Sequence, residues 1–358
     1  MKKYIFFLIP LLFVNTVYSQ VLYNDDFDNY TLGNLGTDPT GTIPGQGGWL
    51  TNANKVPNNN CFTITTEPNK GKVLTLSAPV SSSIGSDMLF ITKPGIDSFI
   101  DQRTNGNNVI KFEIDYYTGP QYYISGNNGS PPYGQIRLLS ETGSLFSYDH
   151  QLLSQAEYIT ASYYNGASTN NGVKLGNDPW GDLLPVDTWV TFIVYMDYTN
   201  KKIYFETPYF GTVVSGDFLS QSTSTNLIED FKPVEIRFNI NANTNSNVQH
   251  IINRYDNIKI TALKKVPQSI IDLSTHDFLS EKFNIYPNPA TNVVNITNNE
   301  NRLVNKIEVY DTTGKLINTQ NYNNEAEIQL NVEHLASGTY MLHLQTAEGT
   351  AVKKLVKK

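Results

Sequence analysis

Residues 187–206 read Asp-Thr-Trp-Val-Thr-Phe-Ile-Val-Tyr-Met-Asp-Tyr-Thr-Asn-Lys-Lys-Ile-Tyr-Phe-Glu. Apolar residues recur at every second position on both sides of a polar turn at residues 198–201. Successive side chains of a strand point to opposite faces, so this alternation predicts two antiparallel strands joined as a hairpin. The inward positions are Val190, Phe192, Val194, Met196, Ile203 and Phe205.

The same alternation recurs at residues 109–116, 234–240 and 256–262. Strands with one apolar face pack as antiparallel sheets, apolar face against apolar face. The number of such strands predicts an all-β protein with a two-sheet jelly roll over residues 20–263. We predict no long helix, and residues 149–159 are the best short helical candidate.

The composition is that of a secreted β protein. Charged residues make up 16% of the chain, against about 25% in a typical globular domain. A net charge of −7 disfavours nucleic acid as a partner, because phosphate binding requires a basic surface. The single cysteine, Cys61, cannot form an internal disulfide, and we expect it to be buried rather than to act as a reactive thiol.

The first residues predict export. Lys2 and Lys3 precede an apolar run at residues 5–14, and the residues before Gln20 suit signal-peptide cleavage. We predict a signal peptide at residues 1–19, with an uncleaved membrane anchor as the alternative. No other apolar run approaches about 18 residues, so we expect no transmembrane segment in the mature chain.

Four short segments near the C-terminus follow one another in a characteristic order. They read Tyr286-Pro-Asn-Pro289, Tyr310-Asp-Thr-Thr-Gly-Lys-Leu-Ile317, Ser337-Gly-Thr-Tyr-Met-Leu-His-Leu344 and Lys353-Lys-Leu-Val-Lys-Lys358. Residues 283–358 thereby resemble the type A C-terminal sorting domain of the type IX secretion system. The resemblance implies that the secretion machinery is a partner. The residues that match the sorting signal are Pro287, Asn288, Pro289, Gly314, Lys315, Gly338, Tyr340, Lys353 and Lys354.

The residues of this domain predict a small β-sandwich of roughly seven strands. Pro287 and Pro289 fix φ and predict an extended leading segment. Residues 311–314 predict a hairpin turn, because Gly314 can adopt a positive φ. The lysines at the C-terminus predict a basic last strand. An ordinary terminal immunoglobulin-like domain is the alternative.

The chain is thus expected to have four parts. The signal peptide at 1–19 precedes the jelly-roll module at 20–263, a linker at 264–282 and the sorting domain at 283–358. The resemblance implies passage through the periplasm and across the outer membrane, with removal of the sorting domain in the linker. The module is then secreted or attached to lipopolysaccharide at the outer cell surface.

Three segments of the module resemble concanavalin A-like, or laminin-G-like, jelly rolls. They are residues 26–33 together with 45–49, the hairpin at 187–205 and the closing residues 255–260. The superfamily contains lectins, carbohydrate-binding and adhesion modules, glycoside hydrolases and polysaccharide lyases. Fold alone does not select among these functions.

The most tempting catalytic pair is Glu113 with Asp115. Side chains two apart on a strand point the same way, about 7 Å apart, whereas a retaining glycosidase needs two carboxylates about 5–5.5 Å apart. The laminarinase-like branch of the superfamily carries a further Glu on this strand, and that Glu is missing here. A solvated outer face near Lys111 is the simpler interpretation, so we expect no catalysis by this pair.

A polysaccharide lyase needs a Tyr or His base, with Arg and an amide side chain to neutralise a uronate. Arg137 and Arg237 lie on predicted strands among tyrosines, but Glu235 offers Arg237 a simpler role in an ion pair. His150 and His250 have no obvious partner, so the sequence shows no clear lyase signature.

Two long loops, at residues 116–134 and 161–185, are rich in aromatic side chains among Gly, Asn and Pro. Aromatic rings stack on sugar C–H surfaces, and acidic or amide groups bind hydroxyls. The candidate ligand-binding residues are Tyr122, Tyr123, Tyr133, Tyr163, Tyr164, Trp180 and Asp178. The alternative is that these aromatics pin the loops onto the sandwich.

Acidic residues near both ends of the module are candidate ligands for a structural calcium ion. In jelly rolls of this kind the first and last strands often share a rim, where Asp26, Asp28 and Asp256 would meet. The alternative is that Asp256 begins a turn into the last strand. We expect no other cofactor.

The sequence therefore predicts a secreted or cell-surface binding or adhesion module, with a polysaccharide or surface glycan as ligand. A polysaccharide-degrading hydrolase or lyase and a purely structural surface protein are the alternatives. The missing second Glu favours the binding module over the enzyme.

Overall fold

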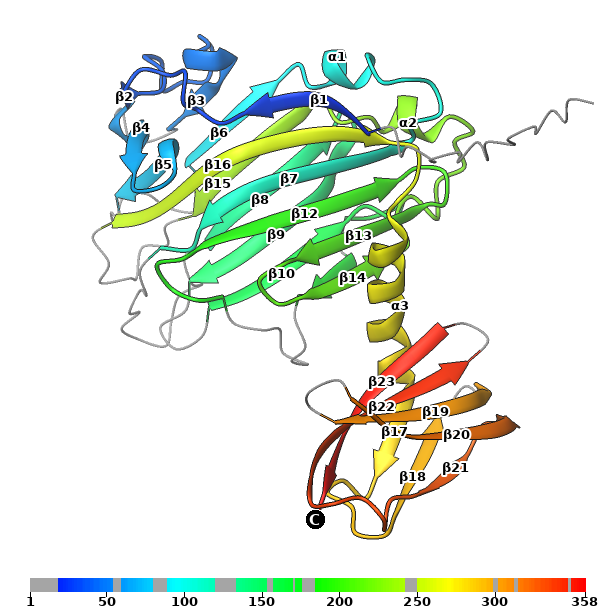
Figure 1. Cartoon of the computed structure of the whole chain (residues 1–358). Coiled ribbons are helices and arrows are strands. Elements are labelled where there is room, and N and C mark those ends of the chain that lie inside the picture. Colours follow the sequence, from blue (N-terminus) through cyan, green and yellow to red (C-terminus); the bar gives the residue numbers. More distant parts are fainter. Residues whose placement is uncertain are drawn as a thin grey trace, which may run out of the picture.

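The computed structural model describes residues 19–53, 59–79, 89–119, 133–152, 157–169, 171–175, 184–241, 250–298, 302–311, 315–346 and 349–358. A large and a small β-sandwich are joined by one long helix, α3 (Gln268–Lys282) (Figure 1). In the described residues, no helix has the length and apolarity that crossing a bilayer requires.

One sheet of the large sandwich has nine strands, in the order β14-β13-β12-β7-β16-β5-β4-β2, with β1 also paired to β16. All its strand pairs are antiparallel. The strands are β1 (Ser19–Asp25), β2 (Gly33–Asn34), β4 (Phe62–Glu67), β5 (Gly71–Pro79), β7 (Val109–Tyr117), β12 (Trp189–Asp197), β13 (Lys202–Thr207), β14 (Thr212–Gly216) and β16 (His250–Leu263).

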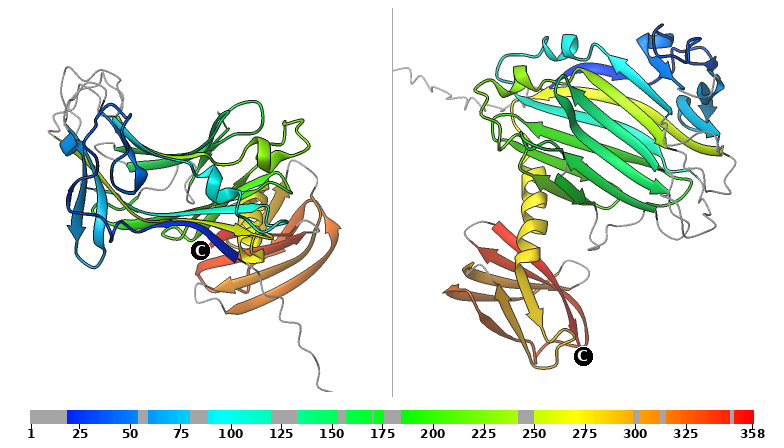
Figure 2. Two further views of the ribbon diagram at one scale, coloured as in Figure 1. Left: turned by 90° about the horizontal axis from the view of Figure 1, so that it is seen from above. Right: turned by 180° about the vertical axis from the view of Figure 1, so that it is seen from behind.

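The second sheet has seven strands, in the order β11-β10-β9-β8-β15-β6-β3. It lies behind the nine-stranded sheet in Figure 1, and the view from above separates the two layers (Figure 2). Its strands are β3 (Leu50–Asn52), β6 (Leu89–Pro94), β8 (Tyr133–Ser140), β9 (Gly143–Leu152), β10 (Glu157–Tyr163), β11 (Asn171–Lys174) and β15 (Glu235–Asn241). The short helices are η1 (Gln46–Gly48), η2 (Asn59–Cys61), α1 (Asp97–Ile100) and α2 (Leu227–Asp230).

The core lies between the two sheets and contains the side chains that the alternation predicted to point inward. Phe112 on β7, Phe192 on β12 and Phe205 on β13 are fully buried. Across the layers Phe192 stacks on Tyr148, with ring centroids 4.5 Å apart. Burying a side chain of this size contributes about 1.5–3 kcal/mol. The predicted two-sheet jelly roll is confirmed, because the two antiparallel sheets pack with their apolar faces together.

The carboxylate of Asp25, at the end of β1, holds the following loop on the sandwich. Its Oδ2 accepts hydrogen bonds from the hydroxyls of Tyr23 (3.0 Å) and Tyr30 (2.6 Å). Nε1 of the fully buried Trp49 donates to the same oxygen at 3.1 Å. The backbone N–H of Phe27 donates to Oδ1 at 3.2 Å. Four donors on one carboxylate make this residue the anchor of residues 26–49.

Helix α3 occupies residues 268–282 of the predicted linker, so the prediction of no long helix is wrong. The helical candidate at residues 149–159 is wrong, because its two ends lie in strands β9 and β10. The first turn of α3 is stabilised by tertiary packing, since Val266 and Ile270 are buried on the outer face of the nine-stranded sheet. They contact an apolar patch formed by Val109, Ile193, Tyr195, Tyr204, Val213 and Leu263. A weak local pattern of this kind becomes helical only through such packing.

The small sandwich pairs a three-stranded with a four-stranded sheet, which confirms the predicted seven strands. Their orders are β17-β18-β21 and β20-β19-β22-β23. Leu342 and Leu344 are fully buried between the sheets and Tyr340 is almost so, as the alternation predicted. The strands are β17 (Phe283–Tyr286), β18 (Val293–Asn298), β19 (Val304–Asp311), β20 (Leu316–Glu325), β21 (Ile328–Asn331), β22 (Gly338–Thr346) and β23 (Gly349–Lys357).

We predict that Ile270→Ala lowers the free energy of unfolding by about 2–4 kcal/mol, because a buried Ile cut to Ala leaves a cavity against the patch. Leu273→Ala, on the same helix at 42% exposure, is the matched control and should change it by less than about 0.5 kcal/mol. Chemical denaturation of the full chain measures both. Equal effects of the two substitutions would show that α3 does not dock on the sheet.

Candidate functional site

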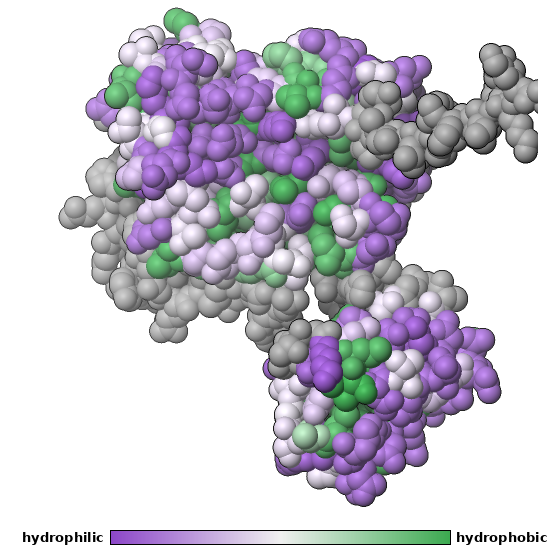
Figure 3. Space-filling model, in the orientation of Figure 1, coloured by the Kyte–Doolittle hydropathy of each residue, from purple (hydrophilic) through white to green (hydrophobic). Residues whose placement is uncertain are grey.

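The predicted pair Glu113 and Asp115 lies on the outer face of the nine-stranded sheet, on β7. This sheet faces the viewer in Figures 1 and 3, and its surface is mainly hydrophilic. Oε1 of Glu113 accepts a hydrogen bond from Nζ of Lys111 at 2.7 Å. Glu113 is therefore neutralised by its strand neighbour.

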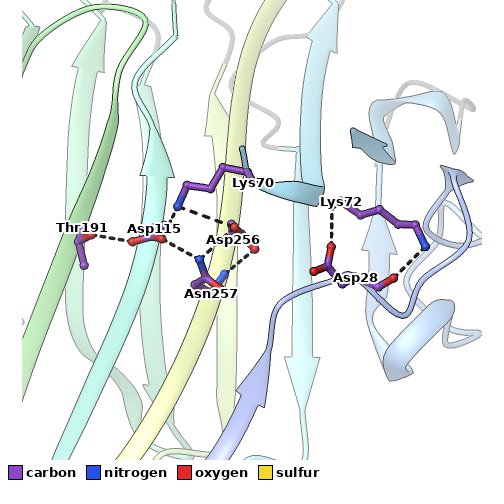
Figure 4. A network of polar contacts seen from close by, with 7 residues as sticks. All are labelled: Asp28, Lys70, Lys72, Asp115, Thr191, Asp256 and Asn257. Atoms are coloured by element: carbon purple, nitrogen blue, oxygen red, sulfur yellow. Dashed lines mark hydrogen bonds and ion pairs between the residues drawn. The ribbon is translucent and has the colours of Figure 1, made fainter. Parts of the chain in front are cut away.

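Asp115 is held by three other side chains (Figure 4). Nζ of Lys70 lies 2.5 Å from its Oδ2, and Nδ2 of Asn257 donates to that oxygen at 2.9 Å. Oγ1 of Thr191 donates to Oδ1 at 2.6 Å. Burial acts to raise the pKa of Asp115, but these hydrogen bonds outweigh it, and the pKa lies below its ordinary value. Asp115 is therefore ionised, and its contacts with these three side chains stabilise the fold.

Asp256 sits directly opposite Asp115 at a bulge in β16. Its neighbour Asn257 has a φ of +51°, which Asn tolerates better than most residues. The bulge brings the side chains of both residues onto one network, with Nδ2 of Asn257 donating to Asp256 at 3.1 Å. Asp256 is 1% exposed, and burial raises its pKa to about 6, although the backbone N–H of Asn257 and the charge of Lys70 oppose the shift.

The three acids predicted to bind calcium do not form a ligand set. Oδ1 of Asp26 accepts the N–H of Asp28 at 3.2 Å, and Oδ1 of Asp28 accepts the N–H of Lys72 at 2.8 Å. Oδ2 of Asp256 forms an ion pair with Nζ of Lys70 at 3.9 Å. Across the described residues no cluster of three His, Cys, Asp or Glu side chains is arranged to hold a metal. The calcium site therefore stays a prediction.

The candidate aromatic residues are placed in part. The ring of Tyr163 packs towards Phe205, and its hydroxyl accepts the N–H of Asp217 at 3.2 Å. Tyr164 packs on Phe231 with centroids 5.8 Å apart. Both are partly buried against the core, as in the alternative that they pin loops. Tyr122, Tyr123, Trp180 and Asp178 lie outside the described residues, as does the side chain of Tyr133.

The outer face of the seven-stranded sheet carries a row of polar side chains that the sequence did not single out. Asn239, Gln135 and Asp149 are register partners on β15, β8 and β9. Nδ2 of Asn239 donates to Oε1 of Gln135 at 2.9 Å, and Nε2 of Gln135 donates to Oδ1 of Asp149. The hydroxyl of Ser147 donates to the other oxygen of Asp149 at 3.1 Å. A hydrogen-bonded relay thus crosses three strands; we call it the amide row.

Two guanidinium groups lie beside the amide row. Arg237 and Arg137 are register partners, two residues along β15 and β8 from Asn239 and Gln135 and on the same face. Arg237 forms an ion pair with Glu235 at 2.6 Å and lies 5.1 Å from the ring centre of Phe90. The expected Arg237–Glu235 pair is therefore present. Burial raises the pKa of Asp149, while Gln135, Ser147 and the charge of Arg137 oppose the shift.

Sequence periodicity placed these side chains on polar faces but did not bring them together. The outward residues of 133–140 and 235–241 alternate with buried Ile136, Leu138 and Phe238. Their pairing depends on strand register and on strands far apart in the sequence, and period-two alternation does not specify either.

In the small sandwich, the segment after β17 lies against the last strand. Nδ2 of Asn288 donates to the carbonyl of Lys354, and the N–H of Val356 donates to Oδ1 of Asn288, both at 2.8 Å. Ala290 continues the contact by accepting from Lys358 and donating to Val356. Residues 287–289 form bends, so the predicted extended leading segment is wrong at these residues.

The other predicted sorting-signal residues that the structure describes lie in the four-stranded sheet or in its β19–β20 turn. Gly338 and Tyr340 lie on β22, and the hydroxyl of Tyr340 donates to the carbonyl of Ala336 at 2.9 Å. The N–H of Lys315 donates to Asp311 at 3.0 Å in the β19–β20 turn. Gly314 lies outside the described residues.

We predict that the free energy of unfolding of the Asp256→Asn variant, relative to wild type, increases as pH rises. The folded-state pKa of about 6 exceeds the unfolded value of about 3.9. The stability that the wild-type carboxyl gains by binding its proton is therefore present below pH 4 and lost as pH rises through 6. Relative to wild type, the variant should gain about 1–3 kcal/mol between pH 4 and pH 7.

Denaturation of both proteins at the two pH values measures this gain. Glu141→Gln, an exposed substitution on the β8–β9 turn, is the control and should show no change in the difference. A wild-type-to-variant difference that is the same at both pH values would contradict the prediction.

Comparison with known proteins gives one family. Residues 284–358 match the model of the secretion system C-terminal sorting domain. No curated protein matches the chain.

Several solved structures are similar to the chain at low identity. A sialidase is 10% identical, with a TM-score of 0.38, over 76% of this chain, which spans only 22% of the sialidase. An alginate lyase from Klebsiella pneumoniae is 12% identical, with a TM-score of 0.37, over 57% of this chain and 85% of its own. A beta-glucanase catalytic domain from Podospora anserina is 11% identical, with a TM-score of 0.37, over 67% of this chain and 95% of its own. At these values the similarities carry no argument about function.

The family match agrees with the four sequence motifs and with the seven-stranded sandwich that they build. Residues 284–358 are therefore a C-terminal sorting domain of the type IX secretion system, and the chain that carries them is exported to the cell surface or secreted.

Proposed function

We propose that the jelly-roll module is a saccharide-binding module, exported through its sorting domain, and that the amide row is its binding face. The observation that carries this proposal is the relay of Asn239, Gln135 and Asp149 across three strands. Side-chain amides and carboxylates are the groups that bind sugar hydroxyls, because each can donate or accept in a fixed direction.

The relay is held in place before any ligand arrives. Each member sits on a strand of a packed sheet; Gln135 and Asp149 are partly exposed, and the buried side chains of Asn239 and Ser147 donate hydrogen bonds that hold them. Side chains fixed in this way lose little conformational entropy on binding, so more of the interaction energy appears as affinity. Arg137 adds planar donors next to the row, which suits hydroxyls and carboxylates alike.

A second candidate function is polysaccharide degradation, and one observation favours it. The carboxyl of Asp149 has a raised pKa and lies in the field of Arg137. A carboxyl with a pKa shifted towards neutrality suits general acid–base catalysis. The predicted pair Glu113 and Asp115 does not support this function, because Lys111 and Lys70 occupy the two carboxylates. A purely structural surface protein is the third possibility.

We predict that the purified full chain binds a subset of glycans on a polysaccharide array. Gln135→Ala should weaken that binding at least tenfold, since the relay loses its central member; tenfold corresponds to about 1.4 kcal/mol. Glu113→Gln, on the opposite sheet, is the matched control and should bind as wild type does. Isothermal titration with the best array ligand measures the affinities.

The same samples separate the alternatives. Loss of binding in Glu113→Gln but not in Gln135→Ala would move the site to the other sheet. Release of reducing ends or of unsaturated uronate, abolished by Asp149→Asn, would establish the enzyme. Absence of both binding and product would favour the structural protein. Adding a chelator to the same samples tests the calcium prediction, because removal of a structural calcium ion should lower the melting temperature.

A further inference from the structure

Building on the proposed saccharide-binding function, we propose that Phe90 is the platform on which one sugar ring of the ligand stacks. We further assign the ligand to one class: an extended, neutral glycan chain with equatorial linkages, lying across the strands of the seven-stranded sheet. Phe90 lies on β6 and is not among the aromatic residues that the sequence singled out.

The side chain of Phe90 stands on the outer face of the seven-stranded sheet. Its chain neighbours Leu89 and Ile91 are buried in the core, so alternation along β6 turns Phe90 outward. The ring is partly exposed, and the guanidinium of Arg237, on the same face, lies 5.1 Å from the ring centre. Packing between the two sheets therefore does not account for an aromatic ring at this position.

Strand register aligns Phe90 with the amide row. Asn239 is its direct partner on β15, and Asn52 is its direct partner on β3. At the other end of the row, Thr160 on β10 is the direct partner of Asp149. One line of register partners thus crosses six neighbouring strands, and we call it the cross-strand track. Its members are Asn52, Phe90, Asn239, Gln135, Asp149 and Thr160, all partly exposed except the buried Asn239.

The spacing of the strands sets the shape of the ligand. Neighbouring strands lie ~4.8 Å apart, so the cross-strand track is about 24 Å long. A pyranose ring with equatorial linkages on both sides is about as long as one strand spacing of ~4.8 Å. An extended chain therefore places one ring over each strand, whereas axial linkages coil the chain away from the sheet. The track fits an equatorially linked glycan of roughly five or six units.

The groups beside Phe90 suit a neutral sugar chain. The face of an aromatic ring is complementary to the C–H surface of a pyranose, and amides on both sides of the ring bind its hydroxyls. Arg237 packs against the ring and forms an ion pair with Glu235 at 2.6 Å, and the charge of Arg137 interacts with Asp149. Both guanidinium groups thus face carboxyl groups of the protein, so the track does not require an acidic sugar.

The ligand class is tested by isothermal titration of the full chain with single oligosaccharides. Affinity should rise about tenfold or more from cellobiose to cellohexaose, because each added ring covers one more strand. Maltohexaose, whose axial linkages coil the chain, should bind about tenfold more weakly than cellohexaose. Equal affinity for cellobiose and cellohexaose, or for maltohexaose and cellohexaose, would overturn the extended chain.

The platform is tested with variants of one residue. Phe90→Ala should weaken cellohexaose binding about tenfold or more, and so should Phe90→Leu, which remains apolar but has no ring face. Phe90→Trp should keep the affinity, and its indole fluorescence should change when cellohexaose is added. Tyr209→Ala is the matched control, because Tyr209 is 53% exposed on the β13–β14 turn of the other sheet, and it should bind as wild type does.

The outcomes separate the platform from the function on which it rests. Wild-type affinity in Phe90→Leu and Phe90→Ala, with weakened binding in Gln135→Ala, would overturn the platform and leave the saccharide site in place. An equal loss in Tyr209→Ala would also overturn it. Absence of glycan binding by the wild-type chain would overturn both proposals. Melting temperatures identify any variant that fails to fold, and Phe90→Trp, which retains an aromatic ring, then decides through its fluorescence.

Discussion

Strand β16 is the element on which the large sandwich depends. It pairs with β7 on one side, and on the other with β5 up to Tyr255 and with β1 from Ile258 onward. The bulge at Asp256 and Asn257 lies at that change of partner. An extra residue in one strand increases local twist and bends the strand, so the bulge sets the directions in which β1 and β5 leave it. The loop held by Asp25 follows β1, and the hairpin that carries Lys70 precedes β5.

The sequence predicted which face of a strand each residue occupies, but it did not predict which side chains contact one another. Alternation in residues 109–116 and 189–205 assigned every inward side chain, because strand geometry alone decides which face a residue occupies. Lys70 and Asp115 are 45 residues apart in the sequence, and only the fold brings them into contact. Helix α3 was missed because packing of Ile270 on a distant patch stabilises it, and helical propensity is too weak a signal to reveal it.

The sorting domain was the more predictable part, because its motifs are local and occur in a fixed order. Even here the sequence did not explain why the first motif and the last belong together. Asn288 and β23 lie at opposite ends of the domain's sequence, and only the fold brings them together.

The two outer faces of the jelly roll differ in what they offer a ligand. On the nine-stranded sheet, Lys111 and Lys70 are each neutralised by a carboxylate of β7, and Arg254 pairs with Glu67 at 3.0 Å. A ligand there must displace an ion pair, and the desolvated partner left behind opposes binding. On the seven-stranded sheet, the central contacts of the amide row join neutral amides to one carboxyl, and its members Gln135 and Asp149 are partly exposed. A sugar hydroxyl can add to such a relay without breaking it, and each added bond polarises the next. Under the proposed function, the ligand therefore binds the seven-stranded sheet, while the ion pairs on the nine-stranded sheet stabilise the fold.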